Sequence, residues 1–149
     1  MRPSISCNQE HVCFSGGRVV FFSTSLATAS AVTPNYMLYV STKGAVEQIS
    51  RTLAKELGAR QITVNTVAPG PINTDMFRQG KTEQQIAFFA SMHPPKRLGE
   101  PEEVANVVAF LAGPESSWVN GQTLRVNGVR AVLTFGRTSP LTDTQGFVV

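Results

Sequence analysis

The segment ITVNTVAPGPINT, residues 62–74, contains the strand and the turn that decide the fold class. Its first six residues are rich in apolar and β-branched side chains, which is typical of a strand buried in a parallel sheet. The Pro-Gly-Pro sequence at 69–71 then forces the chain away from the strand in a rigid turn. Such a turn exposes backbone N–H groups and the Thr74 hydroxyl at the sheet end, although an ordinary strand-to-loop connection has a similar composition.

Two further strands and a long helix are predicted around this segment. Residues 19–22, Val-Val-Phe-Phe, follow a pair of glycines and indicate a second buried strand, and residues 122–126 indicate a third. A helix starts near Tyr39, has apolar residues at a 3–4 spacing and ends with Gly58 as its C-cap. The apolar positions of this helix are Val46, Ile49, Leu53 and Leu57.

A second helix is predicted between the last two strands. It begins with Pro101, whose missing N–H costs nothing at the first helical position. Glu102 and Glu103 follow in the first turn, where they interact favourably with the helix dipole. The buried stripe of this helix consists of Val104, Val107, Val108 and Leu111. Strands that alternate with helices in this way indicate an α/β fold with a parallel sheet covered by helices.

Tyr39 and Lys43 lie four residues apart at the front of the first helix, which places both side chains on one helical face. A phenol ordinarily ionises near pH ~10, and a neighbouring ammonium lowers the pKa of a phenol because it favours the phenolate. A tyrosine in this setting can donate or accept a proton near neutral pH. Ser25 adds a hydroxyl at the C-terminal end of the strand at 19–22, where open parallel sheets bind ligands.

Plainer interpretations stay open for each of these residues. A tyrosine and a lysine at this spacing more often belong to a solvated or half-buried helix face, and a short motif alone has a high false-positive rate. The hydroxyl of Ser25 could equally satisfy loop backbone, and Ser23 or Thr24 could take its part.

Taken together and in this order, the motifs resemble the short-chain dehydrogenase/reductase family over roughly residues 16–128. The resemblance rests on Ser25, Tyr-x-x-x-Lys at 39–43 and the segments 65–74, 97–105 and 116–128. Residues 32–36, Val-Thr-Pro-Asn-Tyr, are similar to fungal members that act on ring or polyketide carbonyls. The resemblance implies that the three strands are the last three of a doubly wound, Rossmann-like parallel sheet, which this chain contains in part.

The resemblance also implies a catalytic role for three residues in NAD(P)-dependent interconversion of a small carbonyl compound and its alcohol. Tyr39 would protonate the carbonyl oxygen on reduction, or act as the base on oxidation. Lys43 would lower the pKa of this tyrosine and bind the nicotinamide ribose, and Ser25 would hold and polarise the substrate oxygen. The cofactor, NADP or NAD with NADP slightly favoured, supplies the hydride.

Two further regions receive roles from the resemblance. Besides Tyr39 and Lys43, the residues implied in cofactor binding are Pro69, Gly70, Ile72 and Thr74, which would place the nicotinamide carboxamide. Residues 75–92 would form a mobile lid over the substrate. The apolar residues of this stretch, which could instead pack as an amphipathic helix on the body, are Phe77, Ile86, Phe88 and Phe89.

The family's dinucleotide-binding features have no counterpart in this sequence. The 12 glycines include no G-x-G-x-x-G pattern, which would place the pyrophosphate at a helix N-terminus. We therefore expect an atypical leader at 1–15, the C-terminal portion of the family's domain at 16–128 and an unmatched tail at 129–149. Such a truncated chain would lack independent activity and would self-associate or bind a full-length relative. Alternatively, it is a non-catalytic fragment or interaction module that associates through the family's dimer helix.

The composition excludes several classes of protein. With 42% hydrophobic and 15% charged residues, 149 residues are enough for one compact domain. A net charge of +3 with scattered basic residues argues against nucleic acid binding, and no apolar run approaches the ~20 residues needed to span a membrane. The N-terminus lacks a signal-peptide core, so we expect a cytoplasmic chain. Cys7 and Cys13, with His11 between them, lack a metal-ligand spacing, and we expect free thiols and no metal.

Overall fold

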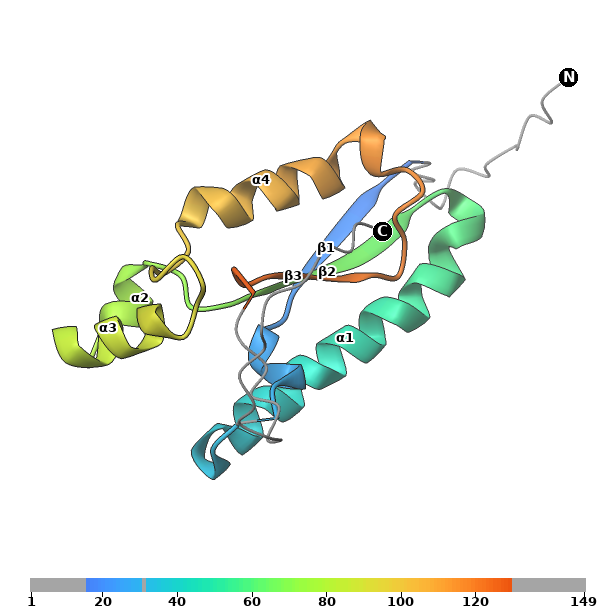
Figure 1. Cartoon of the computed structure of the whole chain (residues 1–149). Coiled ribbons are helices and arrows are strands. Elements are labelled where there is room, and N and C mark those ends of the chain that lie inside the picture. Colours follow the sequence, from blue (N-terminus) through green and yellow to red (C-terminus); the bar gives the residue numbers. More distant parts are fainter. Residues whose placement is uncertain (1–15, 31, 130–149) are drawn as a thin grey trace, which may run out of the picture.

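The protein is a three-stranded parallel sheet covered on both faces by helices (Figure 1). The computed structural model describes residues 16–30 and 32–129. The strands are β1 (Arg18–Phe22), β2 (Thr63–Pro69) and β3 (Thr123–Val126), and they lie in the order β1-β2-β3. This arrangement confirms the α/β class and the parallel sheet that the sequence predicts.

Two long helices and two short ones belong to the part of the chain that the structure describes. Figure 1 shows α1 (Met37–Leu57) and α4 (Pro101–Ala112) on opposite faces of it. The short helices α2 (Asp75–Arg78) and α3 (Glu83–Ser91) lie together beyond one end of the sheet. Single 3-10 turns occupy Ser25–Thr28, Pro34–Tyr36, Gly58–Arg60 and Pro114–Ser116.

The central strand β2 is buried on all sides. It pairs in parallel with β1 from Arg18↔Thr63 onward and with β3 from Thr66↔Thr123 onward. Every residue of the strand except the last is buried. In the described part of the chain β1 pairs with β2 alone, so the other edge of β1 carries backbone groups outside the sheet's hydrogen bonds.

Alternate residues of the strands build one core layer on each face of the sheet, as a period of two requires. The layer beneath α1 contains Ala54, Ile62 and Val64, with Val19, Phe21, Leu53 and Leu57 packed against them. The layer beneath α4 is centred on Val67, Val104 and Leu111. The half-buried residues that complete the second layer are Val20, Ile72, Val107, Val108, Val119, Leu124 and Val126.

The inward face of α1 differs from the predicted apolar stripe. Ile49 is 50% exposed, whereas Glu47, Ser50 and Ala54 are the buried residues of this helix. These small or hydrogen-bonded side chains let the helix approach the sheet closely, which larger apolar residues at the same positions would prevent. Gly58 is the C-cap as predicted, but its backbone stays right-handed because the chain continues into a 3-10 turn.

Two asparagines fasten the loop before β3 to the rest of the domain. Asn120 Oδ1 accepts a hydrogen bond from the Val64 N–H at 2.8 Å, and Asn120 Nδ2 donates to the Ala54 carbonyl at 3.2 Å. Asn65 Nδ2 donates to the Val119 carbonyl at 2.8 Å, and Asn65 Oδ1 accepts from the Gln122 N–H. These bonds satisfy backbone groups that the sheet does not pair, so they join α1, β2 and β3 into one unit.

An ion pair organises the turn before α4. Arg97 contacts both carboxylate oxygens of Glu103 at 2.7 Å, and Glu103 also accepts a hydrogen bond from the Glu100 N–H. The hydrogen bond from Arg97, followed by the backbone hydrogen bond, lowers the pKa of Glu103 to about 2. The same pairing with Glu103 raises the pKa of Arg97.

Three hydroxyl oxygens that are completely shielded from solvent make no hydrogen bond within the described residues, namely those of Ser50, Thr63 and Thr66. Because a buried hydroxyl without a partner is unfavourable, we expect Thr66→Val to raise the free energy of unfolding by about 1 kcal/mol. Ser116→Ala is the matched control. Its buried hydroxyl donates to the carbonyls of Leu111 and Gly113, so this change should lower the free energy of unfolding by about 1 kcal/mol. Urea titrations measure both, and a destabilised Thr66→Val variant would contradict the assignment.

The lowered pKa of Glu103 predicts a pH dependence of stability. The ionised carboxylate contributes its full stabilisation above its unfolded-state pKa, and the contribution is lost as pH falls toward about 2. Melting temperatures of wild type should therefore fall more steeply than those of Glu103→Gln between about pH 5 and 2, and added salt should reduce the difference because the pair is exposed. Glu102→Gln, on the same exposed turn, should keep the slope of wild type.

Candidate functional site

Tyr39 and Lys43 lie in the first two turns of α1, where the sequence places them. The 3-10 turn Pro34–Tyr36 leads directly into this helix. Tyr39 is 44% exposed, and Lys43 Nζ lies 6.0 Å from the centre of its ring. Lys43 Nζ also donates a hydrogen bond to the carbonyl of Phe22 at 3.0 Å. The ammonium therefore connects the tyrosine-bearing helix to the C-terminal end of β1.

Ser25 is buried and begins the 3-10 turn that follows β1. The other two hydroxyls of this stretch already have partners. Ser23 Oγ donates to Glu47 Oε1 at 2.8 Å, and Thr24 Oγ1 accepts from the Leu26 N–H. The Ser25 hydroxyl makes no such bond among the described residues, so it is the hydroxyl of the three that is free to contact a ligand.

Glu47 is a residue of this region that the sequence reasoning missed. It lies four residues after Lys43 on α1 and is buried, and its carboxylate accepts the hydrogen bond from Ser23. Ser23 Oγ also lies 3.3 Å from the Lys43 carbonyl oxygen. These contacts fix the end of β1 against α1 and thereby set the position of Ser25. The signal in the sequence that could have identified Glu47 is an acidic residue one helical turn after a lysine.

The turn after β2 uses most of its backbone N–H groups internally, contrary to the expectation that they are exposed. The N–H of Gly70 donates to Val126, that of Asn73 to Gly99 and that of Thr74 to Ile72. A side chain at Gly70 would approach Asn127 to 2.9 Å, which explains the glycine. The N–H of Ile72 makes no hydrogen bond within the described residues and is the free donor of the turn.

The stretch predicted as a lid or a packed helix forms the two helices α2 and α3. Thr74 Oγ1 accepts from the Phe77 N–H and caps the first of them. Ile86 is buried, and the rings of Phe77 and Phe89 meet edge to face at 5.5 Å. Phe88, by contrast, is 62% exposed. The ring contact joins the two short helices to each other, and both the packing of the pair on the body of the domain and its mobility stay predictions.

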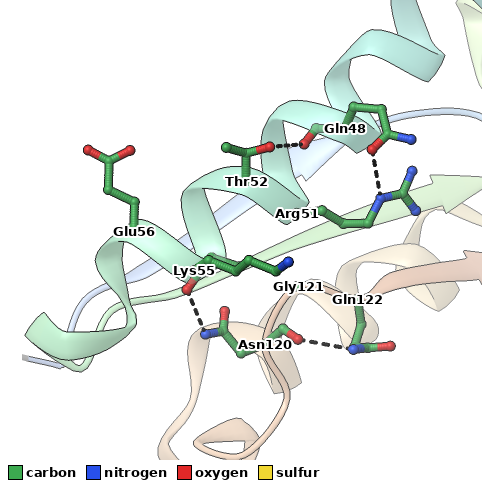
Figure 2. A pocket seen from close by; sticks show the side chains of 9 residues that line it. Gln48, Arg51, Thr52, Lys55, Glu56, Asn120, Gly121 and Gln122 are labelled. Carbon is green, nitrogen blue, oxygen red and sulfur yellow. Dashed lines mark hydrogen bonds between the residues drawn. The ribbon is translucent and has the colours of Figure 1, made fainter.

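A cavity of about 820 Å³ lies away from these residues, between the C-terminal half of α1 and the turn at 120–122 (Figure 2). Figure 2 shows Arg51 and Lys55 extending from the helix toward Gly121 and Gln122. Most of the residues that line it have polar or charged side chains, and none of the predicted site residues belongs to it. The candidate site is thus an open surface at the sheet end rather than this cavity.

The described residues contain neither a metal-binding cluster nor a helix that could span a membrane. No three His, Cys, Asp or Glu side chains of residues 16–30 and 32–129 gather closely enough to hold a metal ion. In the same part of the chain, no helix combines the length and apolarity that crossing a membrane requires. Cys7, Cys13 and His11 lie outside the described residues, and so do the proposed leader and all of the tail except Val129.

The family model for enoyl-(acyl carrier protein) reductases matches residues 6–128. A short-chain type dehydrogenase/reductase from Picea abies is 49% identical over 113 residues, which are 76% of this chain and 41% of that protein. An NADPH-dependent aldehyde reductase-like protein, chloroplastic, from Arabidopsis thaliana is 43% identical over the same shares. The chain thus spans less than half the length of these relatives.

Solved structures share the fold. A blue fluorescent protein from a metagenomic library, in complex with NADPH, superposes with a TM-score of 0.71 at 37% identity and covers 78% of this chain and 46% of its own. The angucycline C-6 ketoreductase LanV with bound NADP gives a TM-score of 0.68 at 32% identity, over 76% of this chain and 43% of its own. Together with the parallel sheet and the motifs it carries, these matches show that the chain belongs to the short-chain dehydrogenase/reductase family.

Proposed function

We propose that this chain carries the proton-transfer side of an NAD(P)-dependent oxidoreductase that interconverts a small carbonyl compound and its alcohol. The observation that supports it is the arrangement of Tyr39, Lys43 and Ser25. The first two share a face of α1, Lys43 is bonded to the last residue of β1, and the unbonded hydroxyl of Ser25 follows that strand. In this proposal Tyr39 gives the proton to the carbonyl oxygen, Lys43 binds the nicotinamide ribose, and Ser25 holds the substrate oxygen.

One backbone group in the turn after β2 fits the nicotinamide end of the cofactor. The free N–H of Ile72 sits in the turn after β2 and can donate to a carboxamide oxygen. Around this donor we assign Pro69, Gly70 and Thr74 to the same binding surface, and Lys43 and Tyr39 to the ribose. The cofactor, when bound, supplies or accepts the hydride. The NADPH-dependent and NADP-bound relatives favour NADP over NAD.

The phosphates of the cofactor have no glycine-rich turn to occupy in this sequence. We therefore propose that these 149 residues alone neither bind NADPH nor reduce carbonyls, and that activity also needs the family's dinucleotide-binding portion. A cytoplasmic location belongs to the same proposal. Calorimetric titration with NADPH tests whether the isolated chain binds the cofactor. Tight binding would refute the proposal that it does not.

Reconstitution tests the catalytic assignment. The chain is mixed with the separately produced portion of the Picea abies relative that it does not match. NADPH oxidation is then followed with a panel of aldehydes and ketones. We expect Tyr39→Phe to lower kcat by roughly 10²–10⁴-fold, because it removes the transferred proton. Tyr36→Phe, which contacts Tyr39 edge to face at 6.5 Å, is the matched control and should stay within a few-fold of wild type. Equal activities of the two variants would rule out Tyr39 as the proton donor.

A second function is favoured by the outer surface of α1. Met37 is 70% exposed and Leu38 is 77% exposed, and Ile49 on the same helix is half exposed. Exposed apolar side chains on one helix are typical of an interaction surface. We propose that this surface mediates self-association or binding to a full-length relative, whether or not the chain is catalytic.

The association can be measured directly. We expect Leu38→Glu and Ile49→Glu to shift the chain toward the monomer in sedimentation velocity experiments, since a buried charge opposes association. Gln84→Glu adds the same charge to exposed α3 and should leave the distribution unchanged. A wild-type chain that sediments as a monomer at every concentration would contradict the proposal.

A further inference from the structure

Side-chain hydrogen bonds and one ion pair connect the start of α4 to the two short helices, with Asn73 at the centre of the hydrogen bonds. Asn73 Nδ2 donates to Glu100 Oε1 at 3.2 Å and to Glu100 Oε2 at 3.1 Å. Asn73 Oδ1 accepts from Arg78 Nε at 2.7 Å. The backbone of Asn73 is held as well, because its N–H donates to the Gly99 carbonyl at 2.8 Å. One residue thus contacts the start of α4, the turn before it and the end of α2.

Arg78 extends the connection to the second short helix. It is the last residue of α2, and its guanidinium lies 3.6 Å from the carboxylate of Glu83, the first residue of α3. At the other end of the path, Glu100 directly precedes α4, and the N–H of Glu100 donates a hydrogen bond to the carboxylate of Glu103. The side chains of Glu100, Asn73, Arg78 and Glu83 therefore form one path from the start of α4 to α3. Asn73 is its only uncharged member and lies between a carboxylate and a guanidinium.

We propose that Asn73 is a positioning residue that fastens α2 and α3 to the N-terminus of α4 and sets how often these two helices open. An amide is the group that the path requires at this point. Glu100 can only accept a hydrogen bond and Arg78 can only donate one, so the residue between them must donate on one side and accept on the other. An aspartate would accept from Arg78 but would face Glu100 with a second carboxylate.

The position of Asn73 connects this fastening to the proposed cofactor surface. It lies between Ile72, which has the free N–H, and Thr74, which caps α2. An opening of α2 would therefore move the same turn that we assign to the carboxamide. This part of the inference rests on the proposed function, whereas the fastening itself does not.

Hydrogen–deuterium exchange of the full chain, read by mass spectrometry, tests the fastening without any cofactor. We expect Asn73→Asp to speed exchange in residues 75–91 by roughly two- to tenfold, the effect of losing one hydrogen bond, and to leave α4 unchanged. Glu100→Gln alone should have little effect, because an amide oxygen still accepts from Asn73. Asn106→Asp, on the exposed face of α4, is the charge-matched control and should behave as wild type.

The double variant provides the decisive measurement. When Asn73→Asp is combined with Glu100→Gln, the donor and the acceptor exchange places, and the new amide can donate to the new carboxylate while Arg78 keeps its partner. We expect exchange in residues 75–91 to return to the rate of wild type. Exchange as fast as in Asn73→Asp alone would overturn the proposal, and so would equal acceleration in α4. If the swap restores slow exchange but the reconstituted enzyme reduces no carbonyl, the fastening stands and the proposed function falls.

Discussion

The complete burial of β2 is the constraint on which the rest of the structure depends. A strand with neighbours on both edges and helices on both faces has no water to bond its backbone N–H and C=O groups, so these groups must find partners inside. Asn65 and Asn120 provide partners where the sheet does not, and they fix the loop before β3 in doing so. Because all three strands run parallel, their C-terminal ends meet at one edge of the sheet. The hydroxyl after β1 and the turn after β2 are therefore neighbours by topology, before any side chain is considered.

Polar contacts, in addition to the apolar packing of Leu53 and Leu57, then decide how α1 lies on this framework. Its buried residues are a glutamate, a serine and an alanine, and the glutamate reaches back to Ser23 at the end of β1. Lys43 makes the second connection through the carbonyl of Phe22. Two hydrogen bonds at one strand end thus set the position of the helix that carries Tyr39. A helix held by interchangeable apolar contacts could slide, whereas these bonds specify one position relative to the sheet.

The sequence predicts the helices and strands well because their hydrophobic periodicity is strong. It fails where the position or role of a residue depends on residues far away along the chain. The runs at 19–22 and 62–67 and the Tyr39–Lys43 spacing are local patterns, and the structure has both strands and the shared helix face. The inward face of α1 is predicted wrongly at Ile49, since a spacing of three and four residues fits two adjacent faces equally. The positioning role proposed for Asn73 could not be predicted at all, because it depends on a hydrogen bond to Glu100, which lies 27 residues away along the chain.

The catalytic and the associative interpretations of this chain are connected through α1. Tyr39 is partly exposed, and the most exposed apolar residues of the same helix, Met37 and Leu38, lie directly before it. General acid catalysis gains from a site that excludes water, since electrostatic interactions strengthen as the local dielectric falls. A partner that covered Met37 and Leu38 would also approach Tyr39, so one contact would bury the apolar surface and shield the phenol. Under the proposed function, association and proton transfer would be two consequences of the same surface, and a charge placed at Leu38 should weaken both together.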